Sequence, residues 1–143
     1  MRAGASARPG SLDGLLGAEE AHATFHDARL LRVAIDLVEG RLAAELEICV
    51  GDPAATFGRD RERRRRGTLT VFGLSLWSLD PIAVGRGALC ITDDGPLSET
   101  PDPIGRALAS RCDPDRIGWW LFFSNVGAFG HVAGERAEFR WDP

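Results

Sequence analysis

The sequence predicts a single, mainly β domain: an antiparallel β-sandwich or a curved sheet of about six strands, accompanied by two short helices. Apolar and polar residues alternate over residues 28–50, and four further apolar and aromatic runs are separated by turns that contain glycine or proline. The chain has 143 residues, of which 44 % are hydrophobic and 27 % charged, as is typical of one soluble globular domain. We therefore expect a disordered tail over residues 1–10 and one β-rich domain over residues 11–143.

The beginning of this domain predicts a short helix followed by a β-hairpin. Ser11 can cap a helical turn whose leucines at positions 12, 15 and 16 share one face. A strand follows from about Ala28, and a tight turn at Glu39–Gly40 leads into its antiparallel partner. The side chains expected to face inward are Leu31, Val33, Ile35 and Leu37 on the first strand and Leu42, Ala44, Leu46, Ile48 and Val50 on the second.

The remaining strands are predicted from apolar runs at residues 68–79, 88–92, 116–126 and 135–141. Between them, Asp102 followed by Pro103 is a good start for the second short helix. The runs at 68–79 and 116–126 are apolar on both faces, whereas a strand with one solvated face alternates. We expect these two strands to be covered on both sides, unless one apolar face is a dimer or partner surface.

The composition bears on the compartment and on the partners. All 17 basic residues are arginine and the net charge is −4, which argues against nucleic acid as the main partner and favours a basic protein. The cysteines Cys49, Cys90 and Cys112 form no CxxC pair, so we expect free thiols in a reducing compartment. The N-terminus lacks a signal-peptide pattern, and no apolar run reaches the ~20 residues of a membrane span. These features predict a cytoplasmic protein without a membrane segment.

The most suggestive polar residues lie just before the first strand. His22 and His26 are four positions apart, as in zinc sites of the HExxH type, and Asp27 follows. The glutamate of that motif is missing, and only distant residues such as His131 could complete a set of ligands. We therefore favour a structural role, in which His26 and Asp27 fix the entrance of the strand by bonding free backbone groups.

A run of six arginines and two acidic residues lies between the glycines at 58 and 67. The pairs Asp60–Arg64 and Glu62–Arg66 are four residues apart and suit a short solvated helix, so we interpret this run as an exposed connection. The alternative is a partner surface, for which the candidates are Arg61, Arg63, Arg64, Arg65 and Trp120. Trp120 follows Trp119 in a predicted strand, so the two indoles point to opposite faces, and burial of both is the simpler interpretation.

No catalytic or cofactor-binding pattern stands out in the sequence. The glycines between positions 127 and 134 precede a strand and not a helix, so they do not form a phosphate-binding loop. The serines have no nucleophile-elbow context, and Cys112 has no histidine near it in the sequence. We therefore expect no catalytic residue, no metal and no cofactor.

The order of features carries a resemblance to a known group of proteins. A short leucine-bearing helix precedes Phe25-His26-Asp27-Ala28, a hairpin follows, and a late GAFGHV segment leads into an alternating terminal strand. This pattern resembles small bacterial β-rich proteins with an F-H-D-A segment, some of which are classed as immunity proteins of the "immunity protein 50" type. The resemblance covers the first half of the chain and the second half in outline, and the arginine run is not part of it. It implies a non-enzymatic protein that binds and blocks a cognate bacterial toxin.

Two other functions remain open from the residues alone. One is a small metal-dependent or ligand-binding enzyme that uses His26 and Asp27 together with His131. The other is a homodimer of unknown function whose apolar strand faces meet. The sequence thus predicts a protein-binding domain first, with an enzyme and a homodimer as alternatives.

Overall fold

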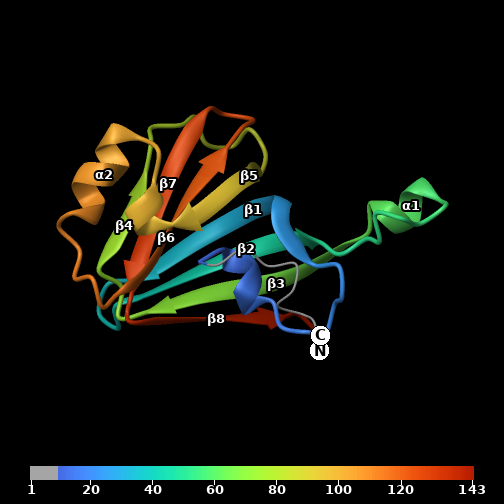
Figure 1. The fold of residues 1–143 in the computed structure, drawn as a ribbon, viewed down its shortest axis with the longest axis horizontal. Helices are drawn as coiled ribbons and strands as arrows, with labels where there is room; N and C mark the ends of the chain where they lie inside the picture. The colour runs from blue at the N-terminus through green and yellow to red at the C-terminus, as the bar shows by residue number, and fades with distance from the viewer. Residues whose placement is uncertain (1–9) are drawn as a thin grey trace.

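The computed structural model describes residues 10–143, so nearly all of the tail predicted at 1–10 lies outside the described residues. Eight strands form one antiparallel sheet with the order β4-β7-β6-β5-β1-β2-β3-β8 (Figure 1). The mainly β fold is therefore confirmed, with eight strands where about six were expected. The strands are β1 (Thr24–Asp36), β2 (Arg41–Cys49), β3 (Arg64–Phe72), β4 (Leu76–Leu79), β5 (Leu89–Pro96), β6 (Ile117–Phe123), β7 (Ala128–Gly134) and β8 (Arg136–Trp141).

The sheet is strongly curved. Strands β7 and β8 follow each other in the chain, yet β7 lies beside the edge strand β4 and β8 forms the opposite edge. The chain crosses between them at Glu135, whose N–H donates to the Phe72 carbonyl at 2.8 Å. Gly134 is needed at this crossing, because a Cβ there would lie 2.6 Å from Val71 Cγ1. Figure 1 shows the result, with β8 along the bottom of the view below β3, and β7 at the upper left near β4.

The hydrophobic core lies on the inner face of the curved sheet. Its fully buried members include Phe25 of β1, Val71 of β3 and Phe123 of β6. The predicted N-terminal helix is a single 3-10 turn, η2 (Leu12–Leu15), and the Ser11 side chain caps it by accepting from the Asp13 N–H at 3.2 Å. Two leucines of this segment, at positions 12 and 16, are buried against the core. The short helix thus closes one end of the curve.

The first hairpin is confirmed, but the inner face of β1 differs from the prediction. The pairing with β2 is irregular between Leu30 and Arg32, so Leu30 is buried and Leu31 is 38 % exposed. Leu37 lies in the turn beyond the strand and is 89 % exposed. The inward positions predicted for Leu31 and Leu37 are therefore wrong, and Ile35, predicted on the same face, is 37 % exposed. The five residues expected to face inward on the return strand are all buried.

The turn between β1 and β2 has the predicted glycine. Gly40 has a φ of +66°, which a residue with a side chain rarely adopts. The Asp36 carboxylate accepts from the Glu39 N–H at 2.9 Å and from the Val38 N–H at 3.0 Å. These contacts, led by the one from Glu39, hold the pKa of Asp36 below its usual value. The turn therefore has a fixed shape although its apolar residues are exposed.

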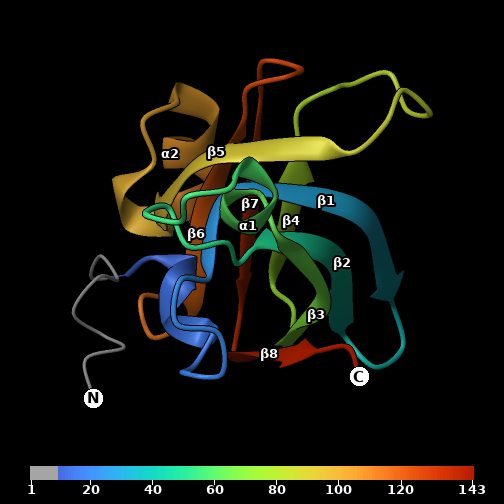
Figure 2. The same ribbon diagram turned by 90° about the vertical axis from the view of Figure 1, so that its right-hand side faces the viewer.

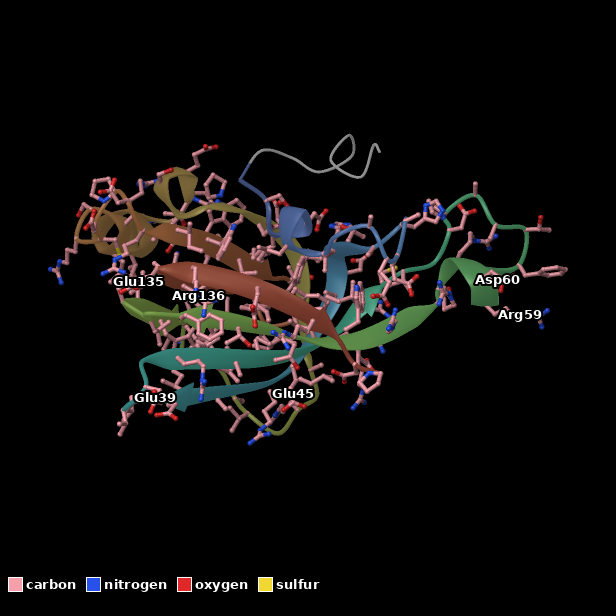
Figure 3. All side chains as sticks on the ribbon, turned by 90° about the horizontal axis from the view of Figure 1, so that it is seen from below. Glu39, Glu45, Arg59, Asp60, Glu135 and Arg136 are labelled. Carbon is pink, nitrogen blue, oxygen red and sulfur yellow. The ribbon has the colours of Figure 1, made fainter. Side chains whose placement is uncertain are left out.

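Two predicted elements in the middle of the chain are corrected. Only Gly58–Arg61 is helical (α1) in the arginine run, and β3 already begins at Arg64. The strand expected over 68–79 is two strands, because Gly73 with a φ of +59° ends β3 and sends β4 to the far edge of the sheet. Figure 1 shows α1 at the tip of an arm that projects from the sheet, and Figure 3 places Arg59 and Asp60 at that tip. The connection is thus exposed, as expected, but shorter.

Two short helices cover the outer face of β6 and β7. They are η3 (Leu97–Glu99) and α2 (Pro103–Ala109), and Asp102 caps α2 as predicted by accepting from the Gly105 N–H at 2.9 Å. Trp119 and Trp120 are both buried, which confirms that β6 is covered on its two faces. Within the described part of the chain, no helix combines the length and the apolar character that crossing a membrane requires.

Candidate functional site

The segment Phe25–Ala28 forms a bulged entrance to β1. Phe25 is fully buried, whereas Asp27 adopts a φ of +66° and the pairing with β2 shifts between Thr24 and Arg29. His26 Nδ1 lies 2.8 Å from the Thr92 carbonyl oxygen, and the Asp27 carbonyl accepts from Arg64 Nη1 at 2.7 Å. The His26 ring and the backbone of Asp27 thus bond to neighbouring strands, and this bulge directs the path of β1.

The three histidines lie in separate places. His22 Nε2 is 3.9 Å from Asp52 Oδ2, and His26 Nε2 is 3.7 Å from Asp27 Oδ2, with all four side chains about half exposed. His131 is completely buried on β7. Over residues 10–143, no three histidine, cysteine or acidic side chains gather closely enough to hold a metal ion. The structure does not bring His131 to the His26–Asp27 pair.

A buried polar cluster, which the sequence did not reveal, connects α2 to the sheet. His131 Nε2 lies 2.9 Å from Asp102 Oδ1 and 3.2 Å from Thr100 Oγ1, and the Thr100 hydroxyl donates to the same carboxylate oxygen at 2.6 Å. Burial alone would raise the pKa of Asp102, but hydrogen bonds from Thr100, the Gly105 N–H and His131 outweigh it and lower the pKa. The cluster fastens the start of α2 to β7. In the sequence, the only sign of this cluster was the single histidine, His131, in a segment predicted to lead into a strand.

The arginines proposed as a partner surface are engaged within the chain. Arg65 donates to the carboxylates of Glu19 and Glu20, and its guanidinium lies 5.0 Å from the centroid of the Trp141 ring. The hydrogen bonds to Glu19 and Glu20 raise the pKa of Arg65. Arg63 donates to Glu20 at 3.0 Å. These contacts hold the segment before β1 against β3.

The other members of the proposed surface are also placed by the fold. Arg61 donates to the carbonyls of Ala55 and Thr56 at 2.7 Å and 3.1 Å, which shapes the arm around α1. Arg64 bonds the Asp27 carbonyl, as described above. Trp120 is buried on the other half of the sheet, so it does not form one surface with the arginines. The arginine run therefore has a structural role in the described chain.

A hollow of about 490 Å³ lies between α2, the 110–116 segment and the strands β6 and β7. Its lining includes Cys112 and two arginines. Arg106 Nη1 donates to the Pro101 carbonyl at 2.7 Å, and Arg116 Nη1 lies 2.9 Å from Glu135 Oε1. Both guanidinium groups thus already have partners in the chain.

The C-terminal half of β1 presents an open edge of the sheet. Strand β1 pairs with β2 over most of its length, but it pairs with β5 only at Arg29 and Leu30. Beyond Leu30, the 80–88 segment leaves β1, and no backbone hydrogen bond joins the two in the described chain. Figure 2 shows β1 turning away from β5 toward its C-terminal end, with the 80–88 segment looping outward. Residues 31–36 therefore have hydrogen-bonded neighbours on the β2 side only.

An apolar groove runs along this open edge. Its volume is about 440 Å³, and its walls come from β1, β4 and the 82–89 segment. The lining includes Val33 and Ile35 of β1 and Trp77 and Leu79 of β4. Of the eight large apolar side chains that are most exposed in the described chain, five lie in the groove or in the adjoining turn. They are Leu31, Ile35, Leu37, Val38 and Val84. Apolar exposure is thus concentrated beside the unpaired C-terminal half of β1.

An open strand edge beside an apolar groove can bind an extended peptide. Free N–H and C=O groups of an edge strand pair readily with another strand, and most proteins protect such edges with charges, proline or a covering loop. When a strand is added, its main chain provides the hydrogen bonds, and alternate side chains enter pockets on one face. Residues 31–36 and the groove supply both parts. They form the candidate functional site, which sequence reasoning had treated as ordinary core.

Comparisons with known proteins identify no family and no function for this chain. The sequence matches no family model, and no curated protein matches it. A solved structure, described as that of an uncharacterized protein from Neisseria gonorrhoeae, shares 12 % sequence identity. It aligns with a TM-score of 0.46 over 82 % of this chain and 94 % of that chain. A likeness of this strength carries no argument about function.

Proposed function

We propose that this chain is a non-enzymatic protein-binding domain that takes an extended segment of a partner protein as an added strand along β1. The observation that carries the proposal is the open edge at residues 31–36, which lies directly beside an apolar groove of about 440 Å³. The bulge at Asp27 and the irregular pairing after Leu30 turn this half of β1 away from β5. The partner strand takes the place that β5 leaves empty.

The groove defines what such a segment must look like. One face of β1 beyond the bulge carries Val33 and Ile35, which pair with the buried Ala44 and Leu42 of β2. Side chains of the partner strand on this face enter the groove, so they should be apolar at alternate positions. The opposite face carries Arg32 and Ala34, where polar partner residues remain in solvent. The partner is therefore an amphipathic extended segment.

The resemblance of the 25–28 segment to immunity proteins supplies a specific class of partner. On this proposal, the bound segment belongs to a cognate bacterial toxin, and pairing with β1 blocks that toxin. The acidic net charge of −4 supports a basic partner, since charge complementarity speeds encounter. No catalytic group is required for this activity.

The test is affinity purification of the tagged full-length chain from its native host, with the partner identified by mass spectrometry. The wild type is compared with Ile35→Lys, which puts a charge into the groove, and with Ile104→Lys as a matched control. Ile104 is 62 % exposed on α2 and does not line the groove, so the same substitution there changes only the surface charge. We expect one protein to co-purify with the wild type and with Ile104→Lys but to be lost with Ile35→Lys.

A partner that is retained equally by both lysine variants would refute binding at this edge. The toxin assignment has its own test, in which the product of the adjacent gene is expressed with and without this protein. If that product is toxic, the wild type should restore growth and Ile35→Lys should not. Failure of the wild type to protect against any adjacent toxin would remove the immunity assignment while leaving the binding site in place.

A further inference from the structure

We propose that, in the isolated protein, the strand that occupies the open edge of β1 is the β1 strand of a second copy. The two strands run antiparallel, related by a two-fold axis at Ala34, and join the two copies through the C-terminal halves of β1, which β5 leaves unpaired. This inference rests on the proposed function, because it uses the same edge and names the strand that covers it when no other partner is present.

The sequence of the open edge is complementary to itself in this register. With Ala34 on the axis, each residue faces the one at the mirrored position, and side chains directly opposite each other share a face of the sheet. Val33 then faces Ile35 of the second copy, and the exposed Leu31 at the bulge comes near Leu37 in the turn of the second copy. Arg32 faces Asp36 of the second copy. The pairs between residues 32 and 36 are therefore apolar with apolar or cation with anion, apart from Ala34 on the axis.

The charged residues are available for this pairing. Within the chain, Arg32 Nη1 lies 3.0 Å from Glu45 Oε2, and the side chains are 69 % and 46 % exposed. Asp36 Oδ2 lies 3.9 Å from Arg41 Nη2, with both side chains almost half exposed. Such exposed ion pairs contribute little to stability, so they do not hold Arg32 and Asp36 away from a second copy. Asp36 Oδ1 accepts from the Val38 and Glu39 N–H groups of the turn, and Oδ2 is the oxygen that meets Arg32 of the second copy. The small side chain of Ala34 lets the two strands approach at the axis.

The apolar residues explain why the edge needs a cover. Leu37 and Val38 are 89 % and 93 % exposed in the single chain, and Val84 across the groove is 85 % exposed. In the paired register, the turn that carries Leu37 comes near Leu31 of the other copy, and Val33 and Ile35 of each copy extend the floor of the groove. Two-fold symmetry repeats each contact, as is usual for homodimer interfaces. The isolated protein should therefore be a dimer.

The mass of the wild-type protein in solution is the first measurement. Sedimentation equilibrium of the full chain at concentrations from about 1 µM to about 1 mM, the range between tight and weak association, should show a dimer of the 15.5 kDa chain. Ile35→Lys should be monomeric, whereas the matched variant Ile104→Lys should associate like the wild type. A wild type that stays monomeric throughout, or a dimer that Ile35→Lys leaves intact, would overturn the inference.

Charge exchange tests the register and does not depend on one variant. Arg32→Asp sets two carboxylates opposite each other, and Asp36→Arg sets two guanidinium groups opposite each other. Each single variant should associate about tenfold more weakly, because like charges oppose each other twice across the axis. An equimolar mixture of the two variants should recover the lost affinity, since every cross-pair is again between opposite charges. Failure of the mixture to exceed either single variant would contradict this register.

The outcomes also separate this inference from the proposed function. A monomeric wild type that still loses its host partner on Ile35→Lys would refute the dimer and support strand addition by another protein. A dimer that Ile35→Lys abolishes, with the host partner retained, would support self-pairing and refute the proposed partner site. Loss of neither association would refute both.

Discussion

Replacing Gly105 with alanine sets two opposing effects against each other. Gly105 is in α2, where alanine is favoured by up to about 1 kcal/mol because it restricts the unfolded chain. The structure, however, leaves no room: a Cβ would lie 2.2 Å from His131 Nε2, 2.4 Å from Asp102 Oδ1 and 2.7 Å from Thr100 Oγ1. The substitution must therefore break the buried cluster that fastens α2 to β7.

The loss should exceed the gain. A buried polar group that loses its partner costs about 1–3 kcal/mol, and both His131 and Asp102 depend on this cluster. Subtracting the helix preference leaves an expected decrease of about 3 kcal/mol in the free energy of unfolding, a large share of the roughly 5–15 kcal/mol typical of a domain. Urea unfolding at neutral pH, followed by tryptophan fluorescence, measures this difference directly.

The matched control is Gly14→Ala. Gly14 lies in η2, and a Cβ at that position would meet nothing within 4 Å. Its substitution should change the free energy of unfolding by less than about 0.5 kcal/mol. If Gly105→Ala proved as stable as the wild type, the packing of α2 against His131 described here would be refuted.

Three further predictions concern the core, the buried cluster and the arginines. Phe25→Ala removes a fully buried ring at the entrance of β1, so urea unfolding should show a loss of about 3–5 kcal/mol; a loss under about 1 kcal/mol would contradict the burial. Because the pKa of Asp102 is lower in the folded protein than its ordinary value of 3.8, the ionised carboxylate stabilises the fold. This stabilisation is fully present above the ordinary pKa and is lost as the pH falls through the pKa of the folded state. Below about pH 5, the free energy of unfolding should therefore fall less steeply with falling pH in Asp102→Asn than in the wild type. Identical pH dependence in the two proteins would contradict this link. Arg65→Met should lower the melting temperature through loss of its pairs with Glu19 and Glu20, and the difference should shrink in about 1 M salt; a salt-independent difference would point to lost packing alone.

Much of the fold follows from local pattern. Alternation over Arg41–Cys49 identifies β2 and its buried face, and the doubly apolar run containing Trp119 and Trp120 identifies a strand covered on both sides. Ser11 and Asp102 are capping residues in the sequence and cap helices in the structure. In each case the decisive interactions lie within a few residues, so spacing and residue type are enough to predict them.

The rest depends on contacts between distant segments. The bulge after Leu30 inserts one extra residue, which reverses the face of every later side chain, and nothing in the alternation before Leu31 announces it. The arginines at 64–66 extend β3 because their partners include Glu19, Glu20 and Glu47, which no local rule can supply. Likewise, the apolar residues of β1 predicted that this strand is buried. Whether β5 pairs with the whole of β1 depends on the path of residues 80–88, which the sequence pattern does not define. The open edge could therefore be seen only in the structure.

Amide hydrogen exchange of residues 31–36 tests the central claim most directly. In an edge strand, alternate N–H groups lack a partner and exchange rapidly, whereas a strand paired on both sides is protected throughout. In the dilute protein, the account predicts rapid exchange at alternate amides of this stretch, and protection of the same amides when a partner protein or a second copy binds. Protection that is already complete in the dilute protein, or that does not change when binding is saturated, would contradict strand addition at β1.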